Sequence, residues 1–220
     1  VALEAGAQSV ALIEAPIAAA IGSGLKVADA RGSMIVDIGG GTTEVAVTSL
    51  GGIVLSSSLR SAGDEIDNAI IAYMKRKHNV LIGEMTAEML KKNIGSVVPM
   101  ADRGNMVIRG RNLLNGLPAT LAVTSAEVRE AMSEQVSRII DCIRTTLENT
   151  PPELSSDIYD NGIMLAGGGA LLSGLDLLIQ QLTGIRTMIA KNPMDCVAMG
   201  IGKVIDSVGE LNGIVNFRTR

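Results

Sequence analysis

The sequence of 220 residues predicts an α/β fold, and two features indicate this class. Short apolar runs suited to strands occur in both halves of the chain, and in the second half they alternate with helical patterns. A hydrophobic content of 47% gives a chain of this length enough apolar side chains for a substantial core. We therefore expect one large domain, or a domain with a second one inserted.

The first third of the chain predicts mainly strands. The opening stretch VALEAGAQSV has the pattern of a helix interior, which suggests a fragment of a longer protein. Apolar runs typical of strands follow at residues 8–13, 34–37, 44–49 and 53–59. The last three lie close enough in sequence to form a meander.

The middle of the chain has a different character. Helical patterns at residues 64–77 and 86–94 precede a polar, glycine-containing stretch, which offers two short strands around Val107 and Leu121. We interpret this part as an insertion into the main fold.

The clearest helix begins at Thr124, because Glu127 three residues later completes a capping box. Apolar residues then keep the spacing of one helix face as far as Leu147. Pro151 and Pro152 end this helix, since proline cannot donate a backbone hydrogen bond and disfavours helical geometry in the residue before it. Beyond it the sequence predicts strands at 163–166 and 185–189 and helices at 171–182 and 194–208.

Composition argues against several classes of protein. A formal charge of −4, a pI near 5.1 and 1% aromatic residues disfavour a nucleic-acid partner. Cys142 and Cys196 are isolated thiols, consistent with a reducing cytosol and too few for a zinc site. The one histidine, His78, lies in the charged stretch MKRKHNV and is expected to be a solvated surface residue. No apolar run reaches the ~18 residues of a membrane span, and no leader pattern is present.

The stretch DIGGGTT joins two predicted strands and suggests an anion site. Three consecutive glycines leave the backbone N–H groups of a tight turn open to a phosphate. Thr42 and Thr43 add hydroxyl donors, and Asp37 can hold a metal-bound water. The alternative is a hairpin turn without a ligand, since the spacing matches neither standard phosphate-binding glycine motif.

The stretch IMLAGGGALLSGL repeats this pattern where a strand leads into a helix, at Gly167, Gly168 and Gly169. A flat ligand could lie against such a turn, although close packing alone also explains it. Two glycine turns more than a hundred residues apart suggest one ligand with a phosphate end and a ring end. A nucleotide has this form.

Two apolar helices carry small residues four positions apart, Ala18 with Gly22 and Ala198 with Gly202. Small side chains let two helices approach closely, so these faces are candidates for a helix crossing. Ordinary packing of alanine-rich helices is the alternative.

Four stretches, in order along the chain, resemble motifs of the actin-type ATPase superfamily. LIEAPIAAAIG resembles its first connecting helix and DIGGGTTEVAV its second phosphate hairpin. GIMLAGGGALLSGL resembles its adenosine motif and NPMDCVAMGIGKVI its second connecting helix. Within the superfamily, AGDEID and IRTTLENTPPELSSDI resemble the MreB family of bacterial cell-shape actins. This resemblance implies an actin-like (ribonuclease H-like) α/β core at about 1–62 and 125–210. It further implies a smaller inserted α+β subdomain at about 63–124 and a tail at 211–220. The first phosphate hairpin of the family is absent, so the chain looks like a C-terminal half.

The resemblance also implies site residues for ATP and Mg²⁺. Asp37 would face the magnesium through water, and the hairpin residues Gly39, Gly40, Gly41 and Thr42 would wrap the β- and γ-phosphates. The other positions are Gly63 and Asp64 near the ribose and phosphates, Gly167, Gly168 and Gly169 behind the adenosine, and Glu88, Lys91 and Lys92 flanking the base. The alternative for these last three is an exposed, charged helix face.

One position departs from the family pattern. The family has a glutamate before the proline of the first connecting segment, and that glutamate orients the attacking water. Here Ala15 precedes Pro16, and Glu14 is the nearest carboxylate. Unless Glu14 substitutes for the missing group, we expect hydrolysis to be slower by about 10²–10⁴, whereas ATP binding need not suffer.

The implied function is an ATP-binding, filament-forming protein that organises cell-wall synthesis and maintains rod shape. Implied partners are further copies of the protein, a RodZ-type membrane-anchored protein and the wall elongation machinery. The protein would be cytoplasmic and would contact the inner membrane face through the missing N-terminal half. The fragment alone should bind ATP poorly. Alternatives on the same superfamily fold are a DnaK-type chaperone, which would append a peptide-binding domain, and a sugar or acetate kinase, which needs a catalytic carboxylate in the first half.

Overall fold

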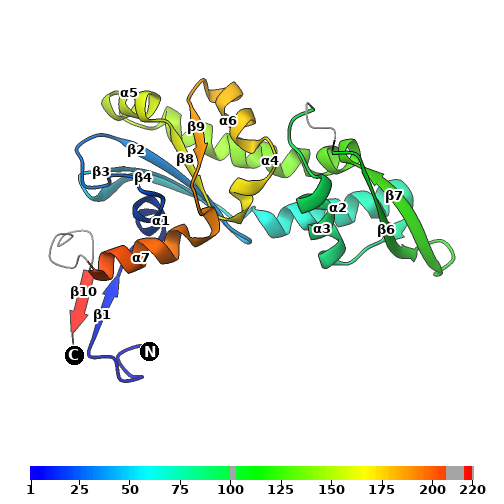
Figure 1. The fold of residues 1–220 in the computed structure, drawn as a ribbon, viewed down its shortest axis with the longest axis horizontal. Helices are drawn as coiled ribbons and strands as arrows, with labels where there is room; N and C mark the ends of the chain where they lie inside the picture. Colours follow the sequence, from blue (N-terminus) through cyan, green and yellow to red (C-terminus); the bar gives the residue numbers. More distant parts are fainter. Residues whose placement is uncertain (100–102, 207–215, 220) are drawn as a thin grey trace.

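The computed structural model describes residues 1–99, 103–206 and 216–219 and confirms the α/β class (Figure 1). Its centre is a five-stranded sheet in the order β4-β3-β2-β8-β9. The three strands β2, β8 and β9 are parallel, whereas β3 and β4 run antiparallel to their neighbours. These strands are β2 (Ser33–Ile38), β3 (Thr43–Ser49), β4 (Gly52–Leu59), β8 (Ile163–Ala166) and β9 (Thr187–Ile189).

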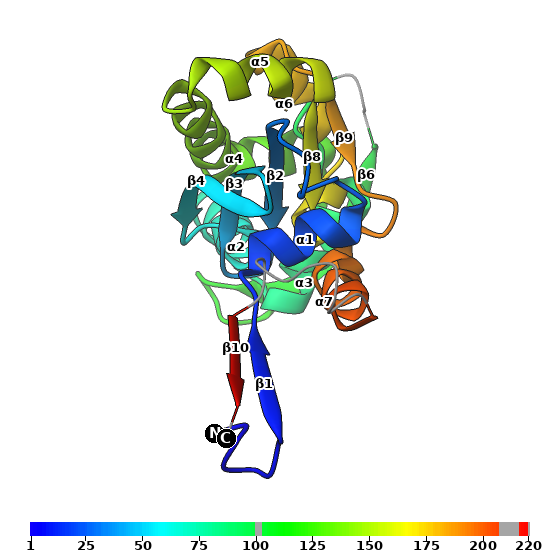
Figure 2. The same ribbon diagram turned by 90° about the vertical axis from the view of Figure 1, so that its left-hand side faces the viewer.

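Helices cover both faces of this sheet (Figures 1 and 2). One face carries α4 (Ser125–Glu148), α5 (Pro152–Asn161) and α6 (Leu175–Thr183), and the other carries α1 (Ala15–Ser23) and α7 (Cys196–Asp206). Successive side chains of a strand point to opposite faces. Val36 therefore lies in the buried cluster that includes α4, while Ile35 lies in the one that includes α1. The result is a three-layer arrangement with two cores.

A smaller antiparallel sheet lies beside the first and has the order β5-β6-β7. Its strands are β5 (Val80–Leu81), β6 (Asn105–Asn112) and β7 (Pro118–Thr124), and the helices α2 (Gly63–His78) and α3 (Glu84–Ile94) pack beside it. All of these elements fall within the segment that the sequence predicts to be inserted. The long helix α4 runs from this sheet to the larger one (Figure 1). The division into subdomains stays a prediction, because one buried cluster extends through both parts.

Helix α4 has the predicted capping box. The Thr124 hydroxyl accepts from the backbone N–H of Glu127 (3.3 Å), and the Glu127 carboxylate accepts from the N–H of Thr124 (2.9 Å). The two prolines end α4 as expected, but α5 begins at Pro152, a helix that the sequence analysis missed. Proline is tolerated in the first turn of a helix because its missing N–H has no partner there.

The prediction that His78 is a solvated surface residue was wrong. His78 is the last residue of α2, and its side chain is only 20% exposed. Its Nε2 atom lies 2.9 Å from Oε1 of Glu127. The long helix α4 thus brings a carboxylate from a distant part of the sequence to cover the ring.

The first residues do not form a helix. Residues 2–6 form turns, and the chain then enters β1 (Ser9–Leu12). This strand pairs antiparallel with β10 (Asn216–Thr219), which lies in the tail for which the sequence predicts no element. The two strands extend together away from the rest of the molecule (Figure 2). A strand partner this remote cannot be deduced from local pattern.

Two predicted helices begin later than expected. A 3₁₀ turn η1 (Gly168–Leu171) occupies the expected start of α6, and Gly174, with φ of +81°, separates it from the helix. A second 3₁₀ turn, η2 (Pro193–Asp195), precedes α7. The predicted end of that helix, residues 207–208, lies outside the described residues. Within those described, no helix has both the length and the apolar character needed to cross a membrane.

Helices α1 and α7 cross with their backbones in close contact. A Cβ atom added to Gly22 would lie 1.7 Å from a carbonyl oxygen of α7, and one added to Gly200 would lie 1.8 Å from the carbonyl oxygen of Ala18. Ala18 and Gly22 are therefore confirmed as contact residues. The prediction that Ala198 and Gly202 lie at the crossing was wrong, because Ala198 is exposed and Gly202 has open space beside it. The face of α7 that meets α1 is the one that carries Gly200.

Candidate functional site

The glycine hairpin between β2 and β3 is closed by a backbone hydrogen bond and is exposed at its tip. The N–H of Gly39 donates to the carbonyl oxygen of Thr42 (2.9 Å) and closes the turn. Gly40, Gly41 and Thr42 are exposed, and a Cβ atom added to Gly41 would meet no atom within 4 Å. The backbone at the tip can therefore be approached by a ligand.

The first turn of α2 holds this hairpin in place. The N–H of Gly63 donates to the Gly39 carbonyl (3.1 Å), and the N–H of Asp64 donates to the Gly40 carbonyl (2.8 Å). The structure thus brings together two segments that the sequence analysis assigned to one site. Both bonds fix the orientation of peptide groups in the hairpin.

The second glycine turn lies beside the first. Strands β2 and β8 are parallel, and Asp37 is the register partner of Ala166, so both turns follow the carboxyl ends of neighbouring strands. Ligands of open α/β sheets bind at this edge. A Cβ atom on Gly167, whose φ is +79°, would lie 2.5 Å from Oδ1 of Asp37. The two turns are therefore in direct contact.

The three glycines of the second turn have different surroundings. A Cβ atom on Gly169 would lie 2.2 Å from the Ile38 side chain, whereas one on Gly168 would meet nothing within 4 Å. Close packing accounts for Gly167 and Gly169. It does not account for Gly168, which has room for a ligand beside it.

Carboxylates gather around the hairpin. Asp37 faces Glu44 across the β2–β3 ladder, and burial, together with the charge of Glu44, raises the pKa of Asp37 above its usual range. The carboxylate of Asp64 lies on the side of Gly40, 3.3 Å from the position of an added Cβ. Like charges directly opposite each other on neighbouring strands repel, and each disfavours the ionised form of the other.

The carboxylates can take part in a magnesium site, although they do not form a complete cage. Among the described residues there is no group of three or more His, Cys, Asp or Glu side chains able to hold a metal by themselves. Mg²⁺ usually keeps several waters and uses one or two carboxylates with the phosphates of a substrate. Asp37, partly exposed at the end of β2, fits that role.

The prediction that Thr43 donates to the ligand was wrong. Its side chain is fully buried, and its hydroxyl donates to the carbonyl oxygen of Ser61 (2.8 Å). The hydroxyl has one hydrogen, which this bond uses. Thr43 therefore anchors the hairpin to the segment before α2.

Lys91 and Asp67 form an ion pair next to the hairpin. The Lys91 ammonium donates to Oδ2 of Asp67 (2.7 Å) and to the carbonyl oxygen of Gly63 (2.9 Å). Both side chains are largely buried, with 15% and 13% exposed. Burial raises the pKa of Asp67 even though Lys91 acts against this. The sequence analysis missed Asp67, although it shares a helix face with Asp64 three residues earlier in the quoted stretch AGDEID.

Glu88 and Lys92, expected beside Lys91, lie on the outer face of α3. They pair with each other at 2.6 Å and have 48% and 67% of their side chains exposed. Their placement matches the alternative of an exposed, charged helix face. Of the three, Lys91 is the one that bonds to Gly63, the residue whose own N–H bonds to the hairpin.

Glu14 and Ala15 stand at the start of α1. Glu14 is the N-cap residue and caps the helix only through its backbone carbonyl, which accepts from the N–H of Ala18 (3.1 Å). Both Glu14 and Ala15 are exposed. Within the described residues no hydrogen bond ties the Glu14 carboxylate to either glycine turn.

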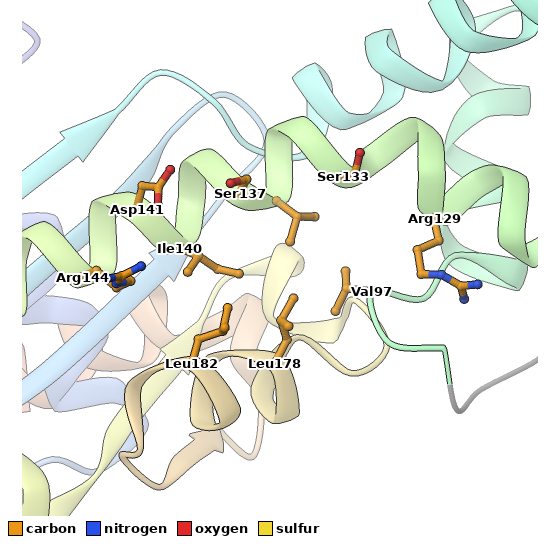
Figure 3. A pocket seen from close by; sticks show the side chains of 10 residues that line it. Val97, Arg129, Ser133, Ser137, Ile140, Asp141, Arg144, Leu178 and Leu182 are labelled. Atoms are coloured by element: carbon orange, nitrogen blue, oxygen red, sulfur yellow. The ribbon is translucent and has the colours of Figure 1, made fainter.

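A separate groove of about 300 Å³ lies between α4 and α6 (Figure 3). Its floor is apolar, and Arg129 and Arg144 stand at its two ends. None of its lining residues belongs to the glycine turns. The groove is therefore distinct from the site at the edge of the sheet.

The mixed sheet, its two helical layers and the paired glycine turns define a protein with the actin-like fold. The crystal structure of MreB5 of Spiroplasma citri bound to ADP has a TM-score of 0.90 and 39% identity, over 94% of this chain and 63% of that one. A second MreB5 structure is bound to AMPPNP, with a TM-score of 0.86 and 38% identity over 90% of this chain and 59% of that one. The MamK double helical filament, at 22% identity, shares the fold with a TM-score of 0.72 over 88% of this chain and 59% of that one.

The chain belongs to the MreB/Mbl protein family, whose model matches residues 1–213. The cell shape-determining protein MreB of Escherichia coli K12 is 51% identical over 93% of the chain, and the cell shape-determining protein Mbl of Bacillus subtilis is 48% identical over 94%. The chain spans about 60% of the length of these curated relatives, 59% and 62%. This match disfavours the chaperone and the sugar or acetate kinase.

Proposed function

We propose that the protein containing this chain binds ATP with Mg²⁺ at the paired glycine turns and assembles into filaments that maintain cell shape. The observation that carries the proposal is the contact between the turns, where Gly167 lies against Asp37 while Gly63 and Asp64 bond to the hairpin. The ADP and AMPPNP bound to MreB5 support it. MamK, which shares the fold, forms a double helical filament, and this supports the proposed assembly.

In this proposal the open backbone of Gly39–Thr42 receives the phosphates, and Gly168 leaves room for the adenosine. Asp37 holds Mg²⁺ through water. The ion neutralises phosphate charge, which the carboxylates around the hairpin would otherwise repel. Lys91 adds a cation at the carbonyl of Gly63, and Glu88 and Lys92 on the outer face of α3 would flank the base, whereas Thr43 anchors the hairpin.

The remaining parts of the proposal follow from membership of the MreB/Mbl family. We propose a core subdomain at 1–62 and 125–210, an inserted one at 63–124 and a tail at 211–220. Organisation of cell-wall synthesis, the RodZ-type partner, the wall machinery and contact with the inner membrane face concern the whole protein. Slow hydrolysis due to Ala15 is part of the same proposal.

The test uses two glycines that leave space in the structure. Gly41→Val and Gly168→Val place side chains where an added Cβ meets no atom of the chain, so both variants should fold. The same side chains would occupy the space assigned to the ligand. Gly83→Val is the matched control, because Gly83 also has open space but precedes α3.

The measurement is titration of the full-length protein with Mg-ATP, followed by sedimentation at polymerising concentrations. We expect both site variants to lose at least tenfold in affinity and to sediment less, while the control binds like the unsubstituted protein. Equal affinity in all four proteins would contradict the assignment of the site. Absence of ATP binding by the unsubstituted protein would overturn the proposed function.

A further inference from the structure

Asp67 and Lys91 join two helices at the margin of the proposed nucleotide site. Asp67 lies in the second turn of α2, and Lys91 lies near the end of α3. Lys91 also bonds to the carbonyl of Gly63, whose own N–H bonds to Gly39 of the hairpin. Gly63 therefore links the Lys91 ammonium to the glycine hairpin. Within the described residues, Asp67 is the one anionic side chain paired with that ammonium.

The hydrogen bonds of Lys91 leave one donor over. An ammonium group has three N–H donors. Two acceptors, Oδ2 of Asp67 and the Gly63 carbonyl, are recorded for it within the described residues. These two bonds fix the position of the nitrogen, and the third donor can serve an oxygen atom of a bound nucleotide.

Asp67 makes an incomplete set of contacts itself. Its Oδ1 atom is buried and has no hydrogen-bond partner in the part of the chain that the structure describes. A buried carboxylate oxygen without a partner is costly, so stability alone is a poor reason for this residue. A buried ammonium, in turn, needs a nearby counter-charge to stay in place.

We propose that Asp67 is a positioning residue that holds Lys91 against the Gly63 carbonyl, so that the remaining N–H of Lys91 bonds to the nucleotide. This inference rests on the proposed function and adds Asp67 to that site. Without Asp67 the flexible lysine side chain would turn towards solvent. The nucleotide would then lose a preorganised contact.

A double-mutant cycle on Mg-ATP affinity tests this in the full-length protein, with Asp67→Asn, Lys91→Met and the double variant. We expect Asp67→Asn to weaken binding about tenfold when Lys91 is present, because hydrogen bonds to charged groups contribute strongly. In the Lys91→Met background the same substitution should change the affinity less than about twofold, since contacting groups are not additive. Asp67→Glu should restore part of the affinity.

The cycle separates positioning from a general structural role. An equal loss on Asp67→Asn in both backgrounds, or no loss in either, would overturn the inference while leaving the proposed function intact. Thermal unfolding without nucleotide verifies that the variants fold, and Glu84→Gln in the exposed first turn of α3 is the control that should bind normally. If the unsubstituted protein fails to bind Mg-ATP, the proposed function fails and this inference fails with it.

Discussion

Gly167 lies so close to Asp37 that a Cβ atom added to the glycine would be 2.5 Å from Oδ1 of the aspartate. The two residues are 130 positions apart in the sequence, and the parallel pairing of β2 with β8 brings them together. The same added atom would lie 2.3 Å from the carbonyl oxygen of Ile38. The second glycine turn is thus part of the wall of the first.

Gly167→Ala should destabilise the chain by more than about 1 kcal/mol, because the side chain both clashes and has to adopt a positive φ. The free energy of unfolding in urea measures this. Gly168→Ala is the matched control, since its Cβ meets no atom within 4 Å, and it should change stability by less than about 0.5 kcal/mol. Equal stability of the two variants would show that the contact is not tight in solution.

Asp37→Asn should stabilise the protein without Mg-ATP and weaken binding of Mg-ATP. Burial and Glu44 raise the pKa of Asp37 in the folded state, so the ionised carboxylate opposes folding at neutral pH. Removal of a like-charge cross-strand pair should add roughly 0.2–1 kcal/mol to the free energy of unfolding. The gain should shrink as the pH falls towards the raised pKa, because Asp37 itself is then neutral.

The matched control for that effect is Glu44→Gln, which removes the same repulsion but leaves Asp37 in place. It should stabilise the fold by less, because the burial of the Asp37 carboxylate remains, and it should keep more of the Mg-ATP affinity. Denaturation between pH 4 and 8 and nucleotide titration are the two measurements. Destabilisation by Asp37→Asn at neutral pH would contradict the interpretation.

Ala15→Glu should increase the rate of phosphate release by the full-length protein at polymerising concentrations with Mg-ATP. A positioned general base or water-orienting group is typically worth about 10²–10⁴ in rate, and alanine cannot supply one. Glu14→Gln is the companion variant. If Ala15→Glu releases phosphate no faster while Glu14→Gln slows release, Glu14 already positions the water, and the interpretation of Ala15 is wrong.

Glu127→Gln should lower stability at neutral pH by about 1 kcal/mol, since glutamine keeps the capping geometry but loses the charge that faces His78. Burial tends to raise the pKa of Glu127, but hydrogen bonds from Thr124 and His78 outweigh it and lower the pKa in the folded state. The stabilisation is therefore complete above the ordinary value of 4.5 and is lost as the pH falls through the lowered pKa. Urea unfolding at pH 7 and pH 3 should show a larger difference between the proteins at pH 7 than at pH 3.

The sequence predicted most elements because their signals are local. The capping box at Thr124 and Glu127, the strands around the glycine hairpin and the two glycine turns all depend on residues within a few positions of one another. Helix α5 was missed although it begins at a proline, and other features that were missed depend on distant partners. Strand β10 exists by pairing with β1, some 200 residues earlier, and His78 is covered by a carboxylate of α4.

The sequence by itself determined the α/β class, the family resemblance and the hairpin that offers open backbone N–H groups. Only the tertiary structure decided which glycines are filled by packing and which leave space, that Thr43 is used as an anchor, and that Lys91 turns to Asp67 while its neighbours face solvent. The physical reason is that residue type and spacing fix local backbone geometry. The free volume and the hydrogen-bond partner of each group are fixed by chain segments that meet only when the two sheets and their helices pack together.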